Sequence, residues 1–425
     1  MTSPKTGSSI PPSHHQEPLT LRNVLPRLTN NTTLHISTPN HDFNMKAYIA
    51  VPVTLAMVIR AHSHKSLTPA GIIAAVLTAA AHAVHPWSLP FALLIVFFMA
   101  GTRVTKIKHD VKAKLTMSAS GSSGGEGART HVQVLANSGV ASVLTLLHAY
   151  QLYKRNEGVL PRSSTDCYAW PGDLLVVGIV ANYAAVAADT FSSELGILSK
   201  SKPRLLTSWN LREVPPGTNG GVTLHGLASG FLGSLVIVAA SVALIPFCGP
   251  KLGGWGLNAR NRFAFAMAIW GGLGSVLDSL LGGWLQQSVV DTRTGRIVEG
   301  DGGKKVLVSQ GGPNSMHYKK RAGVRATLLN EGEGKEAVLS QDTTNTQVQN
   351  ELNEKMGGMD KYDAKKKWRK SSFGDEKPSR VVESGWIGIL DNNEVNFLMA
   401  LTMSLGAMGV ASWFWDVPFS SIIPV

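Results

Sequence analysis

Two aspartates of this 425-residue chain stand inside apolar segments, Asp189 in GIVANYAAVAADTFSSELG and Asp278 in AIWGGLGSVLDSLLGGWLQQ. A charged side chain in the hydrocarbon of a bilayer is costly, so each aspartate needs a partner or a wet cavity. Carboxylate and hydroxyl oxygens suit Mg²⁺, and Glu194 closely follows Asp189. The sequence therefore predicts a Mg²⁺ site at Asp189 and Asp278, with Glu194 as a further catalytic acid; a capped helix end or a packed helix interface is the alternative.

Further polar residues accompany the two aspartates. Asn182 lies seven residues before Asp189, on the same helical face, and Gly274 and Gly282 lie one turn to either side of Asp278. Small residues let another helix or a ligand approach, and both outcomes stay open. The polar residues expected to support the acids are Asn137, Asn182, Ser193, Ser279, Gln286, Asn392, Asn393 and Asn396. The three asparagines at 392–396 are equally well explained as helix caps.

A glycine-rich loop precedes another apolar segment. After Pro215-Pro216 come Gly217, Thr218, Asn219, Gly220 and Gly221. Free backbone amides before a helix favour an anion, so the loop is a candidate phosphate site, although a tight turn explains it equally well. Lys112, in a basic stretch that membrane topology also explains, is a weaker candidate for binding phosphate.

The elements that must position these residues are membrane spans. Of 68 charged residues, 32 lie between Asp291 and Glu383, so the rest of the chain is poor in charge. Since a bilayer core requires roughly 20 apolar residues, we expect eight spans in an all-α polytopic transmembrane helical bundle, with six to nine spans compatible with the pattern. They cover about 45–61, 69–84, 87–101, 131–150, 172–189, 222–247, 262–290 and 394–415.

Charge predicts the orientation of the bundle. Eight spans place loops 62–68, 102–130, 190–221 and 291–393 on one face, and the second and fourth of these are rich in Lys and Arg. That face is expected to be cytosolic. Cys167 and Cys248 would lie toward the opposite face, where free thiols are favoured over a disulfide. An endoplasmic reticulum or related membrane is expected.

Outside the transmembrane body at 45–310, the chain is more polar. Residues 1–44 are expected to form a disordered tail, and 311–384 a disordered charged insertion before the last helix and tail at 385–425. Alternating residues in 291–310 predict a small cytosolic β-hairpin around Asp301-Gly302-Gly303. The basic charge accompanies no recognisable nucleic-acid module, so nucleic-acid binding is not expected.

Five ordered motifs resemble the transmembrane protein 19 family, an integral-membrane family that includes the plant phytyl-phosphate kinase. The motifs are LANSG at 135–139, ADTFSSELG at 188–196, PPGTNGGVTLHG at 215–226, LDSLLGGWLQ at 277–286 and LDNNEVNF at 390–397. The resemblance covers about 45–310 and 385–415. The resemblance implies a multispan fold and phosphorylation of an isoprenoid monophosphate by CTP or another nucleoside triphosphate.

The chain is more distantly similar to the dolichol kinase and phosphatidate cytidylyltransferase group. That likeness rests on Asp189, the 217–221 loop and Asp278-Ser279, whereas Val276 and Leu277 stand near positions where the cytidylyltransferase signature has a second Asp and a Lys. In the kinase hypothesis the acids hold Mg²⁺, the loop holds phosphate, and the glycine-faced spans admit a prenyl chain. A transporter or lipid-handling protein without catalysis, and an adaptor with a signalling loop, remain alternatives; the oligomeric state stays open.

Overall fold

The structure is a computed structural model that describes residues 40–119, 122, 124, 127–156, 167–168, 173–249, 254–306, 308, 380–385 and 387–423. The chain divides into two units, 1–44 and 45–425, and the description below concerns the second. Most of the expected disordered tail and insertion lies outside the described residues. Helix α1 begins at Asn40, within the expected tail, and residues 380–384, at the end of the expected insertion, form a strand.

Six helices in the described ranges are long and apolar enough to cross a membrane. They are α3 (Leu89–Lys106), α5 (His131–Asn156), α6 (Leu174–Gly196), α7 (Leu224–Leu244), α8 (Leu257–Leu285) and α12 (Asn392–Trp415). Helices α1 (Asn40–Ser63) and α2 (Pro69–Ala83) contain the two remaining predicted spans as shorter apolar stretches. The prediction of an integral-membrane helical bundle is therefore confirmed.

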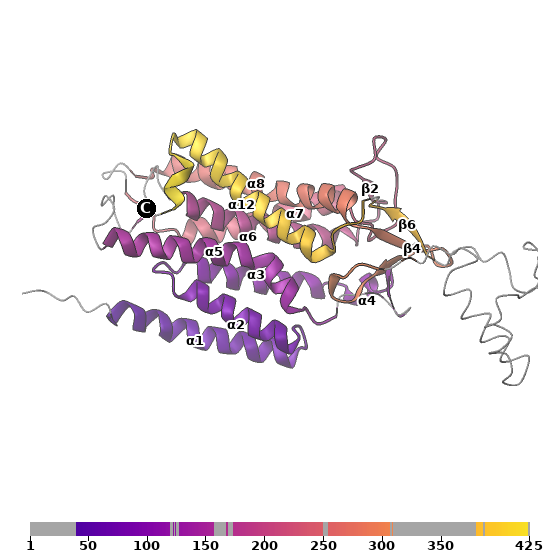
Figure 1. The fold of residues 1–425 in the computed structure, drawn as a ribbon, viewed down its shortest axis with the longest axis horizontal. Helices are drawn as coiled ribbons and strands as arrows, with labels where there is room; N and C mark the ends of the chain where they lie inside the picture. Colours follow the sequence, from indigo (N-terminus) through magenta and orange to yellow (C-terminus); the bar gives the residue numbers. More distant parts are fainter. Residues whose placement is uncertain are drawn as a thin grey trace, which may run out of the picture. The chain divides into compact units, whose positions relative to one another are not determined.

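Helix α6 is the centre of this bundle. In its most apolar window 89% of the residues are buried, against 28–39% in the other five long helices. It packs against α3, α5, α7, α8 and α12, which surround it in Figure 1. An apolar helix that is covered on all sides by protein has little contact with lipid, so α6 positions Asp189 from inside the bundle.

Glycines allow the neighbouring helices to approach α6 closely. A Cβ atom on Gly233 of α7 would lie 2.6 Å from the carbonyl oxygen of Ala187, and one on Gly274 of α8 would lie 2.6 Å from Ala185 Cβ. These glycine faces are therefore occupied by α6. The expectation that they admit a prenyl chain was wrong, since close helix packing leaves no room for it.

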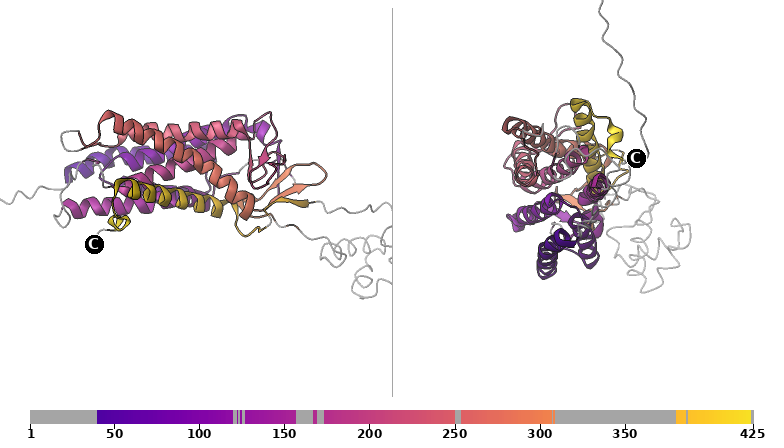
Figure 2. Two further views of the ribbon diagram at one scale, coloured as in Figure 1. Left: turned by 90° about the horizontal axis from the view of Figure 1, so that it is seen from above. Right: turned by 90° about the vertical axis from the view of Figure 1, so that its left-hand side faces the viewer.

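Loops that are distant in sequence meet at one end of the helices. There the sheet order β1-β5-β4-β6 joins β1 (Thr116–Ser118), β5 (Ile297–Glu299), β4 (Ser288–Asp291) and β6 (Arg380–Ser384). A second pair consists of β2 (Arg204–Leu205) and β3 (Gly221–Val222), and helix α4 (His109–Lys112) lies at the same end, as both side views show (Figures 1 and 2). The α1–α2, α3–α5, α6–α7 and α8–α12 connections all lie at this end, as expected if the eight helices cross the membrane in alternating directions.

The predicted hairpin exists, but its turn was placed wrongly. Strands β4 and β5 pair antiparallel, and the turn between them begins at Asp291, whereas Asp301–Gly303 form a 3₁₀ turn, η2, after β5. The Asp291 carboxylate accepts hydrogen bonds from the backbone N–H groups of Thr294 and Arg293. These bonds, the one from Thr294 above all, lower the pKa of Asp291. These side-chain bonds stabilise the turn together with the backbone bond from Gly295 N–H to the Asp291 carbonyl (2.8 Å).

Cysteines 167 and 248 form a disulfide at the other end of the bundle, with their Cα atoms 5.0 Å apart. The expectation of free thiols was wrong. The adjoining residues Tyr168 and Phe247 pair as a β-bridge, and the Tyr168 ring stacks on Trp255 with 5.0 Å between the centroids. Because the cysteines are separated by 81 positions, their proximity could not be inferred from the sequence. After α12, a short 3₁₀ turn, η3 (Phe419–Ile422), ends the described chain on this side.

Candidate functional site

A polar cavity of about 290 Å³ opens where the C-terminal ends of α6 and α8 meet the start of α5, α7 and α12. We call it the polar cavity. Most of the residues predicted for the site line it: Lys112, Asn137, Asp189, Ser193, Glu194, Gly217, Thr218, Asn219, Gly220, Gly221, Asp278, Ser279, Asn392 and Asn396. The N-terminal ends of three helices face this cavity, and their dipoles favour negative charge there.

Asp189 and Asp278 come together in the polar cavity. Their partly buried carboxyl groups lie within hydrogen-bonding distance of each other. With its amide oriented so that both of its polar atoms are satisfied, Asn396 donates to Asp278 Oδ1 at 3.3 Å and to the carbonyl oxygen of Asn392 at 3.0 Å. Two adjacent carboxylates repel each other unless a proton or a cation is shared between them.

This donor set is compatible with Mg²⁺. Among the residues that the structure describes, no group of three or more His, Cys, Asp or Glu side chains could hold a metal ion. Mg²⁺ does not require such a group, because it is commonly bound by one or two carboxylates together with substrate phosphates and waters. Asp189 and Asp278 would supply the carboxylates, and Asn396 would orient the second of them.

The glycine loop lines the polar cavity together with the acid pair. Gly217 and Gly220 have φ angles of +86° and +81°, which few other residues adopt. Gly220 also packs against α8, where a Cβ atom would lie 2.7 Å from Gly283 Cα and 2.8 Å from the carbonyl oxygen of Ser279. The loop is therefore held directly beside the turn of α8 that follows Asp278.

Several amides of this loop are already used inside the protein. Thr218 N–H donates to the carbonyl of Pro215 (3.2 Å), Gly221 N–H to that of Thr218 (3.0 Å) and Asn219 N–H to Ser288 Oγ of β4 (2.9 Å). The loop is thus more ordered and less rich in available donors than its sequence suggested. A phosphate here would depend chiefly on the amides of Gly217 and Gly220 and on the surrounding helix dipoles.

Lys112 and Glu194 line the same cavity but contact each other. Lys112 Nζ donates to Glu194 Oε2, to the carbonyl of Thr105 (2.7 Å) and to that of Val104 (3.3 Å). An ammonium group has three donors, so these bonds occupy all of them. The pair fastens the last turn of α3 to the end of α6, and phosphate binding by Lys112 would require one of these bonds to break.

Three predicted supporting residues lie outside the cavity lining. Asn182 is fully buried within the bundle, where its Nδ2 donates to the carbonyl of Asn137 at 3.0 Å. Asn393 Nδ2 donates to the carbonyl of Gly302 (3.0 Å), and Gln286 Nε2 to Asn392 Oδ1 (3.4 Å). Asn182 stabilises the packing of α5 on α6, and the other two residues brace the start of α12.

The cavity also contains residues that the sequence did not single out. Arg129, Gln133 and Glu299 of β5 line it together with Asn137. Arg129 Nη2 donates to Thr105 Oγ1 at 3.0 Å. A signal was available in the sequence, because a cation just before a helix opposes the helix dipole and therefore suggests an anionic partner. The positive-inside rule uses the same charge only to orient the chain in the membrane.

Comparison with known proteins identifies one family and several relatives. The family model described as "Integral membrane protein DUF92" matches residues 52–404, a range that includes every residue of the polar cavity. Protein PGR of Arabidopsis thaliana is 32% identical over 240 residues, which cover 56% of this chain and 78% of that protein. No solved structure matches.

Another relative matches a smaller part of the chain. The uncharacterized membrane protein MJ0933 of Methanocaldococcus jannaschii is 31% identical over 145 residues, or 34% of this chain. The match spans about half of that protein, 49% of its length. The predicted resemblance to an integral-membrane family is confirmed by these matches.

Proposed function

Because the chain belongs to the DUF92 family of integral membrane proteins, we propose that its polar cavity carries out phosphoryl transfer, as a Mg²⁺- and nucleotide-dependent kinase of an isoprenoid monophosphate. The observation that carries this proposal is the meeting of Asp189 and Asp278 in one cavity that the 217–221 loop also lines. Phosphoryl transfer requires positioning and charge neutralisation more than it requires covalent chemistry by the protein.

The cavity residues would divide the work as follows. Asp189 and Asp278 would hold Mg²⁺, which, when bound, neutralises charge on the nucleotide phosphates. The amides of Gly217 and Gly220, with Thr218 and Asn219, would face the phosphates of CTP or another nucleoside triphosphate. An oxygen of the acceptor monophosphate attacks the γ-phosphorus, the bond to the bridging β–γ oxygen breaks, and the nucleoside diphosphate leaves with that electron pair. An ionised acceptor phosphate has no proton to lose, so no general base is needed.

The position of the acids favours this function over transport. A transporter of the alternating-access type binds its substrate near the middle of the membrane. Asp189 and Asp278 instead lie at the end of the helices that carries the loops and the small sheet. A carrier function would be favoured if flux across vesicles depended on these acids and no phosphate were transferred.

The orientation of the chain forms part of the proposal. We place the polar cavity and the 291–393 loop in the cytosol, where nucleoside triphosphates are available, in an endoplasmic reticulum or related membrane. The basic loops support this orientation. The Cys167–Cys248 disulfide at the opposite end supports it independently, because disulfides persist mainly in oxidising compartments.

The test uses the full-length protein purified in detergent with Mg²⁺, CTP or ATP labelled at the γ-phosphate, and a panel of prenyl alcohols and prenyl monophosphates. We expect transfer to a monophosphate, and a loss of roughly 100-fold or more in Asp189→Asn and Asp278→Asn. Asp416→Asn is the matched control, since Asp416 is exposed at the far end of α12. The absence of transfer to every acceptor would refute the proposal, as would unchanged turnover in both site variants.

A further inference from the structure

A second cavity, of about 350 Å³, lies between α1, α2, α3 and α5. We call it the apolar cavity. Apolar side chains such as Met57, Ile72, Leu94 and Phe98 form most of its wall. Its volume falls within the range of about 300–1,000 Å³ that is usual for small-molecule sites. Unlike the glycine faces of α7 and α8, this space is not filled by a neighbouring helix.

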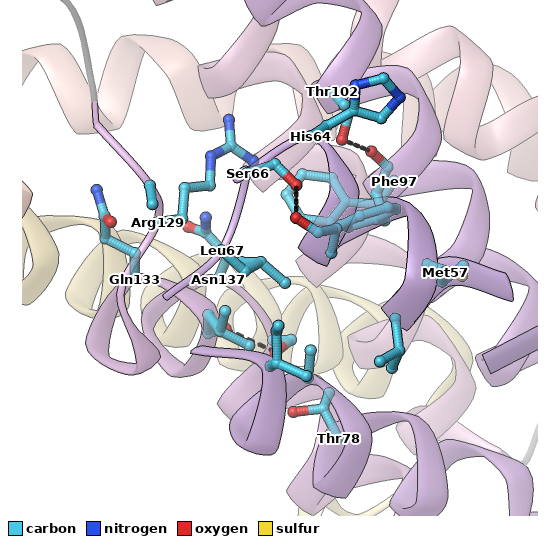
Figure 3. A pocket seen from close by; sticks show the side chains of 18 of the residues that line it. Met57, His64, Ser66, Leu67, Thr78, Phe97, Thr102, Arg129, Gln133 and Asn137 are labelled. Atoms are coloured by element: carbon cyan, nitrogen blue, oxygen red, sulfur yellow. Dashed lines mark hydrogen bonds between the residues drawn. The ribbon is translucent and has the colours of Figure 1, made fainter. Parts of the chain in front are cut away.

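The apolar cavity and the polar cavity share one wall. Five residues line both: Thr105, His109, Arg129, Gln133 and Asn137. Figure 3 shows Arg129, Gln133 and Asn137 together on one side of the apolar cavity, away from Met57 on α1. A molecule whose apolar part filled this cavity could therefore present its other end to Asp189 and Asp278.

The two cavities differ in their balance of charge. Among the described residues that line the apolar cavity there is no Asp or Glu, whereas Lys65, Lys106 and Arg129 contribute positive charge. The polar cavity is lined by four acidic residues, Asp189, Glu194, Asp278 and Glu299, and by two cations, Lys112 and Arg129. An apolar pocket with only basic charges at its edge suits an amphiphile with an anionic head group, and it disfavours a cationic one.

Arg129 occupies a fixed position in the shared wall. Its backbone is hydrogen-bonded on both sides to the α1–α2 connection, from its own N–H to the carbonyl of Ser66 (2.9 Å) and from the N–H of Thr68 to its carbonyl (3.0 Å). Its half-buried side chain reaches Thr105 through Nη2. A guanidinium group presents a planar fork of N–H donors that matches phosphate, and Arg129 brings its positive charge to the wall that both cavities share.

We propose that the apolar cavity binds the hydrocarbon chain of an isoprenoid monophosphate, and that Arg129 holds its phosphate at the shared wall beside the acid pair. This inference rests on the proposed function for the identity of the ligand. It adds the binding site of the chain, the residue that recognises the acceptor phosphate, and the direction of entry, with the acceptor arriving from the side of α1 and α2 and the nucleotide occupying the acidic side.

The first experiment fills the apolar cavity. Ala75 of α2 lines it, and Ala80 of the same helix is exposed and does not. We expect Ala75→Phe to raise the KM for a 20-carbon prenyl monophosphate at least tenfold, with a smaller effect on a 5-carbon acceptor, because a longer chain reaches farther from the shared wall. Ala80→Phe should change neither value. Equal effects of the two substitutions, or no dependence on chain length, would overturn the inference.

The second experiment measures binding without catalysis. The full-length protein in nanodiscs is incubated, without nucleotide, with a 20-carbon prenyl monophosphate that carries a diazirine, and labelled residues are mapped by mass spectrometry. We expect labelling of α2 and α3 residues of the apolar cavity, competition by the untagged monophosphate and weaker competition by the prenyl alcohol. Arg129→Gln should remove the difference between the two competitors. Arg103→Gln, an exposed charge of α3 outside both cavities, should preserve it.

The outcomes separate the two proposals. Phosphate-dependent labelling of the apolar cavity in a protein that transfers no phosphate would refute the kinase and leave the binding site standing. Transfer that is unaffected by Ala75→Phe, together with labelling elsewhere, would refute the binding site and leave the kinase standing. Labelling of the apolar cavity that the alcohol and the monophosphate suppress equally would show occupation by bulk lipid and would also overturn the inference.

Discussion

The Lys112–Glu194 pair offers a direct test of how the polar cavity is built. The pair joins α4 to the end of α6, and its side chains are only 9% and 15% exposed. Removing one partner of such a pair leaves an uncompensated charge, which typically costs about 3–5 kcal/mol. We therefore expect Lys112→Met and Glu194→Gln each to be strongly destabilising.

The two substitutions differ in what remains. After Glu194→Gln, Lys112 can still donate to the carbonyls of Val104 and Thr105, so we expect a cost of about 3 kcal/mol, at the lower end of the range. Lys112→Met strands the Glu194 carboxylate and also removes those two bonds, so it should cost about 5 kcal/mol. In the double variant no charge is stranded, so its cost should not exceed that of Lys112→Met alone. The coupling is then at least about 3 kcal/mol, or roughly 100-fold in the unfolding equilibrium.

The assay is a double-mutant cycle on the free energy of unfolding, measured in one mixed-micelle system for all four proteins. Nucleotide binding to the natively folded variants is measured beside it. Additive costs, with a coupling below about 0.5 kcal/mol, would contradict the structural role derived from the three donors of Lys112. If Lys112→Met also selectively abolished CTP binding, Lys112 would have to be assigned to the phosphates after all.

Two further predictions concern packing and the disulfide. Gly233→Ala should destabilise the protein by about 1–3 kcal/mol, because the new methyl group would lie 2.6 Å from the Ala187 carbonyl oxygen. Gly409→Ala, with no heavy atom within 4 Å of the new carbon, should be neutral or slightly stabilising. Thermal unfolding of both variants in one detergent tests this prediction, and equal effects would contradict the close α6–α7 packing. Peptide mapping of the membrane-extracted protein should yield a Cys167–Cys248 cross-linked peptide only under non-reducing conditions. Replacing both cysteines by Ser should lower the free energy of unfolding by about 2–5 kcal/mol. Free thiols at these positions in the folded wild-type protein would exclude the disulfide.

The helices were predictable because each one carries its own signal. A run of about 20 mostly apolar residues can be recognised from the local sequence alone, and Asp189 and Asp278 are conspicuous as charged residues within such runs. The sheet carries no such signal. Strands β1 and β6 are three and five residues long and pair with segments far away in the chain, so their pairing could not be derived from local pattern.

The same distinction explains the candidate site. Residue type and position within the spans predicted that most of these polar residues lie at one end of the bundle, where they line the polar cavity. Which of them contact each other depends on the three-dimensional fold and could not be predicted in this way. Lys112 meets Glu194 across 82 positions of sequence, and this bond with the two to α3 occupies its three donors, although it still lines the cavity. Arg129 resembles a charge that merely orients the chain in the membrane, until the structure places it in the wall between two cavities.

The polar cavity is completed late in synthesis, because helix α12 contributes part of its lining. Asp189, the glycine loop and Asp278 are synthesised early, whereas Asn392 and Asn396 complete the lining only with the last membrane-crossing helix of the described chain. At about 5–20 residues per second, the ribosome needs on the order of ten seconds to pass from Asp278 to α12. During that interval the central helix is uncovered on the face that Met399 and Met408 later bury. A chain that stops early therefore never acquires a finished cavity and exposes an unpaired membrane face to quality control.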